Sequence, residues 1–175
     1  MKRLITVIIF SSGIFTDAQV AIGKNEVANS SVSLEFGDTE NRGIIVPYIE
    51  NKNGIIEEGT LIYDTSDNKV KYLKGNGVWV NLSEDDGTSS TIGKADLSIQ
   101  GPDKTELETS KVSIGVPNTA DGILVLSDNN KAMILPKVAS PHLQIVQPAA
   151  GMMVYDTTAR QLAVYNGTTW SFWKP

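Results

Sequence analysis

The side chains that could perform chemistry in this chain are few and widely spaced. His142 is the single histidine among 175 residues, and it stands beside Pro141 with no serine-elbow pattern nearby. A Ser-His-Asp arrangement needs a nucleophile and an acid next to the histidine. The chain has no cysteine, so it offers no thiolate nucleophile and no zinc-thiolate site. We therefore predict no catalytic residues, no metal site and no cofactor.

Two aspartates, Asp64 and Asp156, stand in matching Tyr-Asp-Thr sequences. A carboxylate pair can hydrolyse a glycosidic bond when its members lie about 5–9 Å apart. Short acidic side chains also accept hydrogen bonds from nearby amides and so cap turns. Because the two aspartates occupy equivalent places of a repeat, we interpret them as turn caps. The acidic run at 84–86 lacks the alternating ligand spacing of a calcium loop, and we interpret it as a solvated loop.

The elements that position these residues form an internal repeat. The segment GMMVYDTTARQLAVYNGTTWSFWK at 151–174 matches GTLIYDTSDNKVKYLKGNGVWVNL at 59–82, and VSIG at 112–115 matches VAIG at 20–23. Matching landmarks in the same order predict two copies of one unit of about 64 residues. The predicted organisation is a signal peptide at 1–18, a first β-repeat unit at 20–83, a polar joining segment with one strand at 84–111, and a second unit at 112–175.

Within each unit the patterns are those of short strands. Val32, Leu34 and Phe36 alternate with polar residues, which is the period of a half-buried strand. The apolar run at 43–46 follows and stops at Pro47, so we expect an N-terminal hairpin. The fold class expected from these patterns is all-β, built mainly from antiparallel hairpins with short helical turns, in a tandem duplication.

Local turn signals add detail to this expectation. Asn76-Gly77 and Asn166-Gly167 predict tight hairpins, because both residue types tolerate positive φ. Ser140-Pro141 predicts a capped short helix over 141–146. Alternating apolar residues at 95–99 predict one strand inside the joining segment.

The first 18 residues have the composition of a secretory signal peptide. A basic start at Lys2-Arg3 precedes an apolar run at 4–15 and small residues before a cut after Ala18. The run is too short to span a bilayer, which needs roughly 20 residues, and no later stretch is long and apolar enough. We expect export to the extracellular space or outer cell surface, with the periplasm as the alternative. The net charge of −5 argues against a nucleic-acid partner.

Aromatic residues crowd the last strands of both units, and two uses for them stay open. They could form the core or a subunit interface, or they could stack on sugars as a ligand-binding face. The candidate ligand-binding residues are Tyr72, Trp79, Tyr165, Trp170 and Trp173.

The succession V-x-I-G, G-x-x-x-Y-D-T and Y-N-G-x-x-W resembles a repeat of secreted proteins from Bacteroidetes-type bacteria, which look like phage tail-fibre and adhesin stalks. The resemblance covers both units and is closer in the second, where Gly151, Tyr155 and Trp170 fit. The first unit departs from it at Glu57-Glu58 and Lys74-Gly75. The resemblance implies a β-rich, often trimeric surface protein and supplies no catalytic residues.

These observations favour a secreted or cell-surface, non-enzymatic structural or adhesive β-repeat protein. The alternative is a carbohydrate-binding module of the bacterial envelope that uses exposed Trp and Tyr. A unit of about 64 residues without disulfide or metal is marginal alone. We therefore expect self-association as a homo-oligomer, with a trimer favoured, and a glycan or another cell-surface component as a further partner.

Overall fold

The computed structural model describes residues 19–84, 95–100, 103, 107, 110–115 and 119–174, and the predicted signal peptide lies outside them. The first unit, as we use the term below, comprises β1 Val20–Ile22, β2 Val32–Phe36, β3 Ile44–Ile45, β4 Tyr48–Ile49, β5 Leu61–Asp64, β6 Lys69–Gly75 and β7 Val78–Asn81. The second unit comprises β8 Val112–Gly115, β9 Leu124–Ser127, β10 Ala132–Ile134, β11 Lys137–Val138, α2 Pro141–Gln144, β12 Met152–Asp156, β13 Gln161–Tyr165 and β14 Trp170–Trp173, and the 3₁₀ helix η1 Leu97–Gln100 lies between the units.

Each unit ends in a sheet of the same topology. The first sheet has the order β4-β5-β6-β7, and the second has the order β11-β12-β13-β14. In both sheets the first pair is parallel and the other pairs are antiparallel. The amide of Tyr63 donates to Pro47 O at 2.8 Å, and the amide of Tyr155 donates to Pro136 O at 2.8 Å. These matching bonds confirm the predicted all-β class and tandem duplication.

The N-terminal strands of the two units also correspond. β1 pairs in parallel with β2, with Val20 opposite Leu34, and β8 pairs in parallel with β9, with Val112 opposite Leu124. The predicted N-terminal hairpin is wrong, because β2 does not pair with β3. Instead β2 pairs in parallel with β10 and β3 pairs antiparallel with β12, both from the second unit. The alternation of apolar residues predicts that a strand forms but not which strand it pairs with. Here the partner strands lie in the other copy of the repeat.

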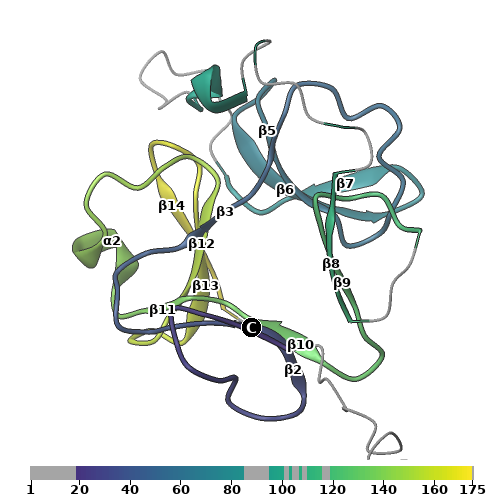
Figure 1. Ribbon diagram of the computed structural model, residues 1–175. Helices are drawn as coiled ribbons and strands as arrows, with labels where there is room; N and C mark the ends of the chain where they lie inside the picture. The colour runs from purple at the N-terminus through teal and green to yellow at the C-terminus, as the bar shows by residue number, and fades with distance from the viewer. Residues whose placement is uncertain are drawn as a thin grey trace, which may run out of the picture.

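The two units share one hydrophobic core. Figure 1 shows the two sheets on either side of β3, with β2 and β10 side by side below. The buried members are Val46, Tyr48, Tyr63 and Val70 from the first unit, and Ala150, Met153 and Val164 from the second. Since each unit supplies part of this core, burial of apolar area holds the two units together.

The joining segment contributes a helical turn rather than the predicted strand. Residues 97–100 form η1, and both Ala95 and Leu97 pack against the shared core. Gln100 Nε2 donates to Tyr48 O at 3.2 Å. An alternation of only three apolar residues does not distinguish a strand from a packed turn, which explains the wrong prediction.

The predicted helix near Pro141 is present but shorter, at Pro141–Gln144. Ser140 precedes it with φ 48° and makes no side-chain cap bond. Its Oγ instead lies 3.2 Å from Thr158 Oγ1. The proline in the first turn therefore agrees with the sequence pattern, whereas the expected serine cap does not.

The two Asn-Gly turns differ. Asn76 and Gly77 both have positive φ, at 51° and 72°, as a tight hairpin requires. In the second unit only Gly167 of the pair does, at 105°. Asn166 is buried, and its Oδ1 accepts from the amides of Thr168 at 2.9 Å and Thr169 at 2.7 Å. A side-chain cap thus replaces the backbone turn that the dipeptide predicts.

This difference has a testable consequence for stability. Asn166→Ala should lower the free energy of unfolding by about 1–3 kcal/mol, because two amides in a closed loop lose their acceptor. Thr169→Ala removes only an exposed side chain and keeps the amide that donates to Asn166, so it should change the free energy by less than about 0.5 kcal/mol. Urea unfolding of the two variants measures both values, and equal midpoints would contradict the capping role.

Candidate functional site

The carboxylate of Asp64 lies buried at the end of β5 and holds a turn together. Its Oδ1 accepts from the Ser66 amide at 3.0 Å and the Ser66 hydroxyl at 2.6 Å. Its Oδ2 accepts from Lys71 Nζ at 2.7 Å and is also bonded to Lys52. Lys71 bonds Asp67 as well, at 2.5 Å. The carboxylate is fully engaged by its own unit.

Asp156 occupies the equivalent place at the end of β12. Its Oδ1 accepts from the amides of Ser140 at 3.1 Å, Thr158 at 2.9 Å and Ala159 at 3.2 Å. Both aspartates therefore bond the amide two residues ahead, which confirms the turn-cap interpretation. Asp156 additionally ties α2 to the second sheet, because Ser140 immediately precedes that helix.

Both carboxyl groups have a lowered pKa. Burial alone would raise the pKa of Asp64, but hydrogen bonds from Lys52, Lys71 and Ser66 outweigh it and hold the pKa well below its usual range. Burial would also raise the pKa of Asp156, but hydrogen bonds from the backbone amides of Ala159, Ser140 and Thr158 outweigh it and lower the pKa. These acids stay ionised, so neither is suited to donate a proton at neutral pH.

The lowered pKa values predict acid sensitivity. Groups whose pKa is lower in the folded than in the unfolded chain contribute stability above the unfolded pKa, about 3.9 for aspartate, and that stability is lost as the pH falls through the folded pKa. The melting temperature should therefore hold from pH 7 to about 5 and fall below about pH 4. In Asp156→Asn the fall should be shallower, and a wild-type slope in that variant would contradict the assignment.

The remaining chemical candidates have structural surroundings. His142 lies on α2, with its ring 5.7 Å from the ring of Phe172 in an edge-on contact. In the acidic run, the amide of Glu84 donates to Ser171 Oγ at 3.2 Å, and the rest of the run lies outside the described residues. Among the residues that the structure describes, no cluster of three His, Asp or Glu side chains could hold a metal ion.

The aromatic candidates do not form one strip. Tyr165 and Trp170 are opposite each other on neighbouring strands, with ring centroids 5.2 Å apart. Trp170 packs against the cluster of Val138, Val154 and Ala163 on the outer face of the second sheet. Trp173 lies on the other face, because side chains alternate along β14. Its indole Nε1 donates to Leu82 O of the first unit at 2.6 Å.

The two candidates of the first unit are likewise separated. Tyr72 is opposite Val80 and Trp79 is opposite Leu73, so neighbouring positions place them on opposite faces of the first sheet. Both side chains are half-buried. The structure therefore brings Tyr165 and Trp170 together. It places Trp173 on the other face of their sheet, and Tyr72 and Trp79 on opposite faces of the first sheet. Their role in ligand binding stays a prediction.

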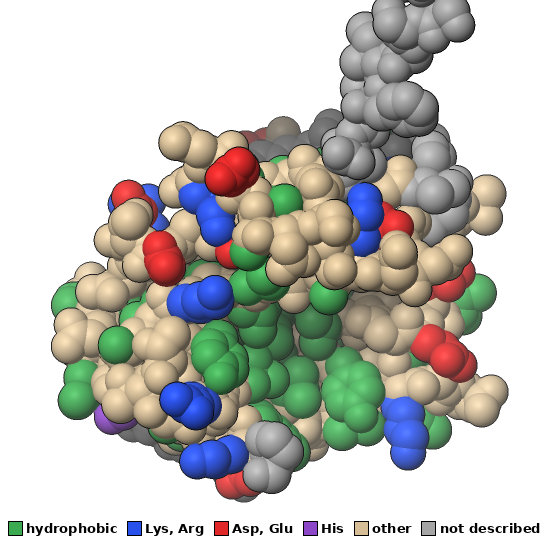
Figure 2. All heavy atoms as spheres, turned by 90° about the horizontal axis from the view of Figure 1, so that it is seen from below, with side chains coloured by type: hydrophobic (Ala, Val, Ile, Leu, Met, Phe, Trp, Pro, Cys, Tyr) green, Lys and Arg blue, Asp and Glu red, His purple; other side chains and the backbone are tan. Residues whose placement is uncertain are grey.

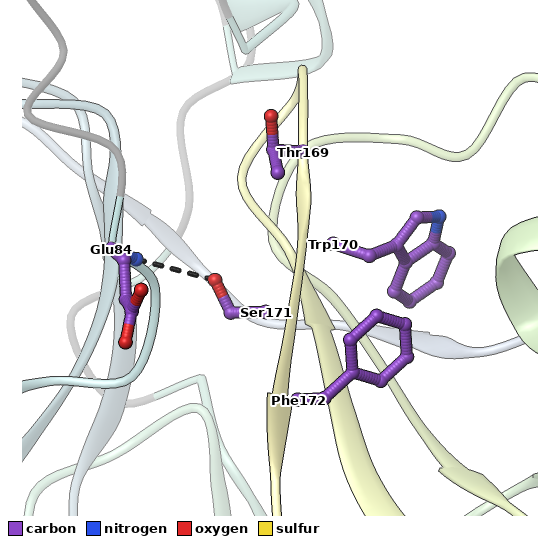
Figure 3. Close-up of a pocket in the computed structure, with 5 residues that line it drawn as sticks. All are labelled: Glu84, Thr169, Trp170, Ser171 and Phe172. Carbon is purple, nitrogen blue, oxygen red and sulfur yellow. Dashed lines mark hydrogen bonds between the residues drawn. The ribbon is translucent and has the colours of Figure 1, made fainter.

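A shallow hollow of about 460 Å³ lies at β14, lined by Glu84, Thr169, Trp170, Ser171 and Phe172. Figure 3 shows the rings of Trp170 and Phe172 on one side of the strand and Ser171 on the other, where it meets Glu84. A sugar-binding site combines an aromatic platform with polar groups on the same side. This hollow divides them, so the carbohydrate-binding alternative gains no support from its shape and stays a prediction.

The contact between the units holds two further tyrosines, Tyr48 and Tyr63, that are not among the aromatic candidates; of those candidates, Trp173 also reaches across it. Tyr63 Oη donates to Asn166 O at 2.9 Å and Tyr48 Oη donates to Ala150 O at 3.0 Å. The two rings meet edge-on with centroids 5.4 Å apart. Burial raises the pKa of Tyr48, and Asp96 adds to the rise. The repeated Tyr-Asp-Thr motif marked Tyr63, but only the fold shows that it joins the units.

Comparison with known proteins adds one match. Residues 112–174, the second unit, match the model of a family described as a phage tail-like trimerisation region. No curated protein and no solved structure matches the chain. The family match supports a tail-fibre-like module and self-association through a trimer. Among the described residues, no helix is long and apolar enough to cross a membrane.

Proposed function

We propose that this chain is a secreted or cell-surface structural protein of the tail-fibre type, without enzymatic activity, in which association of three chains builds a stalk that carries an adhesive surface. The observation that supports this most is the match of residues 112–174 to a phage tail-like trimerisation region. That stretch contains strands β8–β14, so the family match covers the whole of the second unit.

The surface of the molecule supports association. Exposed large apolar side chains include Ile123 and Leu124 at β9 and Phe172 and Trp173 at β14. Figure 2 shows hydrophobic side chains gathered in a recess at the middle of the face below β2 and β10, with charged groups around it. Large contiguous apolar patches on a protein surface mark interaction sites, which supports association of chains through this face.

The buried acids support a structural rather than a catalytic role. The carboxylates of Asp64 and Asp156 each accept hydrogen bonds from a turn of their own unit. The predicted signal peptide supports export, and the resemblance to adhesin stalks supports a place on the cell surface. An adhesive partner would then contact surfaces that remain exposed after the three chains associate.

Fusion of the chain to a monomeric carrier protein tests whether the chain drives trimer formation. The full chain is fused to a monomeric carrier protein, and the mass of the purified fusion is measured by native mass spectrometry. We expect a fusion of three chains, because the module itself drives association, and the carrier alone stays monomeric. A monomeric fusion at micromolar concentration would refute the proposed function.

A further inference from the structure

The contact between the two units joins two different surfaces. The first unit contributes β2 and β3 with Tyr48 and Tyr63, which we call the front face. The second unit contributes β10 and β12 with Ala150, which we call the back face. Because the units are duplicates, the second unit has a front face of its own and the first unit has a back face of its own.

The front face of the second unit is open. Leu34 of β2, covered by β10, is 1% exposed, whereas the equivalent Leu124 of β9 is 48% exposed. Tyr63 is 0% exposed, whereas the equivalent Tyr155 is 37% exposed. In the described part of the chain, β9 pairs with β8 alone and β10 is the last strand of its sheet. Strand edges of this kind are templates for a further strand.

The back face of the first unit is open as well. A Cβ atom on Gly151 would lie 3.3 Å from both Tyr63 Cβ and Val46 Cγ2, so the first unit covers this glycine. A Cβ on the equivalent Gly59 would meet no described atom within 4 Å. The side chains two residues further along differ in exposure in the same direction, since Met153 is buried and the equivalent Leu61 is half-buried.

The open faces carry one pair of opposite charges at equivalent positions. In the observed contact, Tyr48 of the front face bonds Ala150 of the back face. Pro47 and Pro136 hold equivalent bonds, so Lys137 is the counterpart of Tyr48. Gly59 and Gly151 also hold equivalent bonds, so Glu58 is the counterpart of Ala150. Because Tyr48 bonds the backbone carbonyl of Ala150, the equivalent contact would bring the Lys137 side chain to the backbone at Glu58. Opposite charges at these neighbouring positions favour this pairing of unlike faces.

We propose that the open front face of the second unit docks on the open back face of the first unit in another copy of this chain. Within the chain, Ile45 is opposite Met152, so the equivalent Ile134 should be opposite Thr60 of the other copy. Likewise Leu34 is opposite Met133, so the equivalent Leu124 should be opposite Ile44 of the other copy. A contact between unlike faces closes a ring when its rotation permits. The inference rests on the proposed trimer and identifies the surfaces that build it.

Disulfide formation between separate chains tests the register. The chain has no cysteine of its own, and directly opposed residues of antiparallel strands have Cα atoms about 4.5–5.5 Å apart, within reach of a disulfide. A tagged full-length chain with Thr60→Cys is mixed with an untagged chain with Ile134→Cys and oxidised mildly. We expect a mixed dimer on a non-reducing gel. Replacing Thr60→Cys by Val78→Cys, an exposed residue of β7 at the far edge of the first sheet, should reduce its yield at least tenfold.

Charge reversal supplies an independent readout. Lys137→Glu and Glu58→Lys should each raise the dissociation constant of the oligomer about tenfold, and the double variant should restore it. A trimer without the 60–134 cross-link and without charge rescue would overturn the head-to-tail contact while leaving the proposed function intact. A cross-link between Ile134→Cys and Met152→Cys of separate chains would also overturn it, since it shows second units meeting each other. A monomeric wild-type chain would refute both proposals.

Discussion

Tyr63→Ala should lower the free energy of unfolding by about 3–5 kcal/mol, the range for removing a large aromatic side chain from a core. The residue is completely buried, packs edge-on against Tyr48, and bonds the second unit through Asn166 O. Its loss leaves a cavity where the two units meet. Urea unfolding monitored by tryptophan fluorescence gives the value.

Tyr63→Phe is the matched control, because it keeps the ring and removes only the hydroxyl. We expect a loss of about 1–3 kcal/mol from the carbonyl of Asn166 that loses its donor. A loss as large as that of the alanine variant would assign the effect to the hydrogen bond instead of packing. A loss near zero for Tyr63→Ala would contradict the shared core.

Asp64→Ala should destabilise the chain by about 3 kcal/mol, near the lower limit for breaking a buried ion pair. The variant leaves Lys71 buried and deprives Ser66 of two hydrogen bonds. Asp67 remains within 2.5 Å of that lysine, which keeps the loss from being greater. Thermal melting at pH 7 measures the effect.

Asp67→Ala is the control for this prediction. Its side chain is partly exposed, and pairs of this kind contribute about 0–1 kcal/mol. The aspartate at 64 should therefore matter several times more than the one at 67. The opposite order would show that the lysine is held mainly by Asp67 and that the buried turn is not the stabilising feature.

The sequence predicts the duplication because landmarks such as Tyr63 and Tyr155 recur in the same order, and the two sheets confirm it. Strand pairing could not be predicted in the same way. The partners of β2 and β3 lie in the second unit, and the alternation of apolar residues is the same whichever strand lies alongside. Long-range pairing is a property of the packed fold and leaves no local signal.

The site shows the same division. The repeated aspartates predict turn caps from chemistry that operates within a few residues, and the bonds to Ser66 and Thr158 confirm it. Residue type alone identifies the aromatic candidates and carries no information on their faces. Tertiary packing places Trp170 on one face of the second sheet and Trp173 on the other. Asn166 caps its loop because the side chain is buried there, which a dipeptide pattern does not encode.

The measurement that tests the account most directly is the mass of the full chain in solution. Multi-angle light scattering at micromolar concentration should give three times the chain mass of 18.9 kDa, less any removed signal peptide. Dilution should lower the melting temperature, because stability of an associated protein depends on its concentration. A monodisperse single chain, with a melting temperature that does not change on dilution, would contradict the trimer. The two units would then pack only on each other, as one monomeric domain.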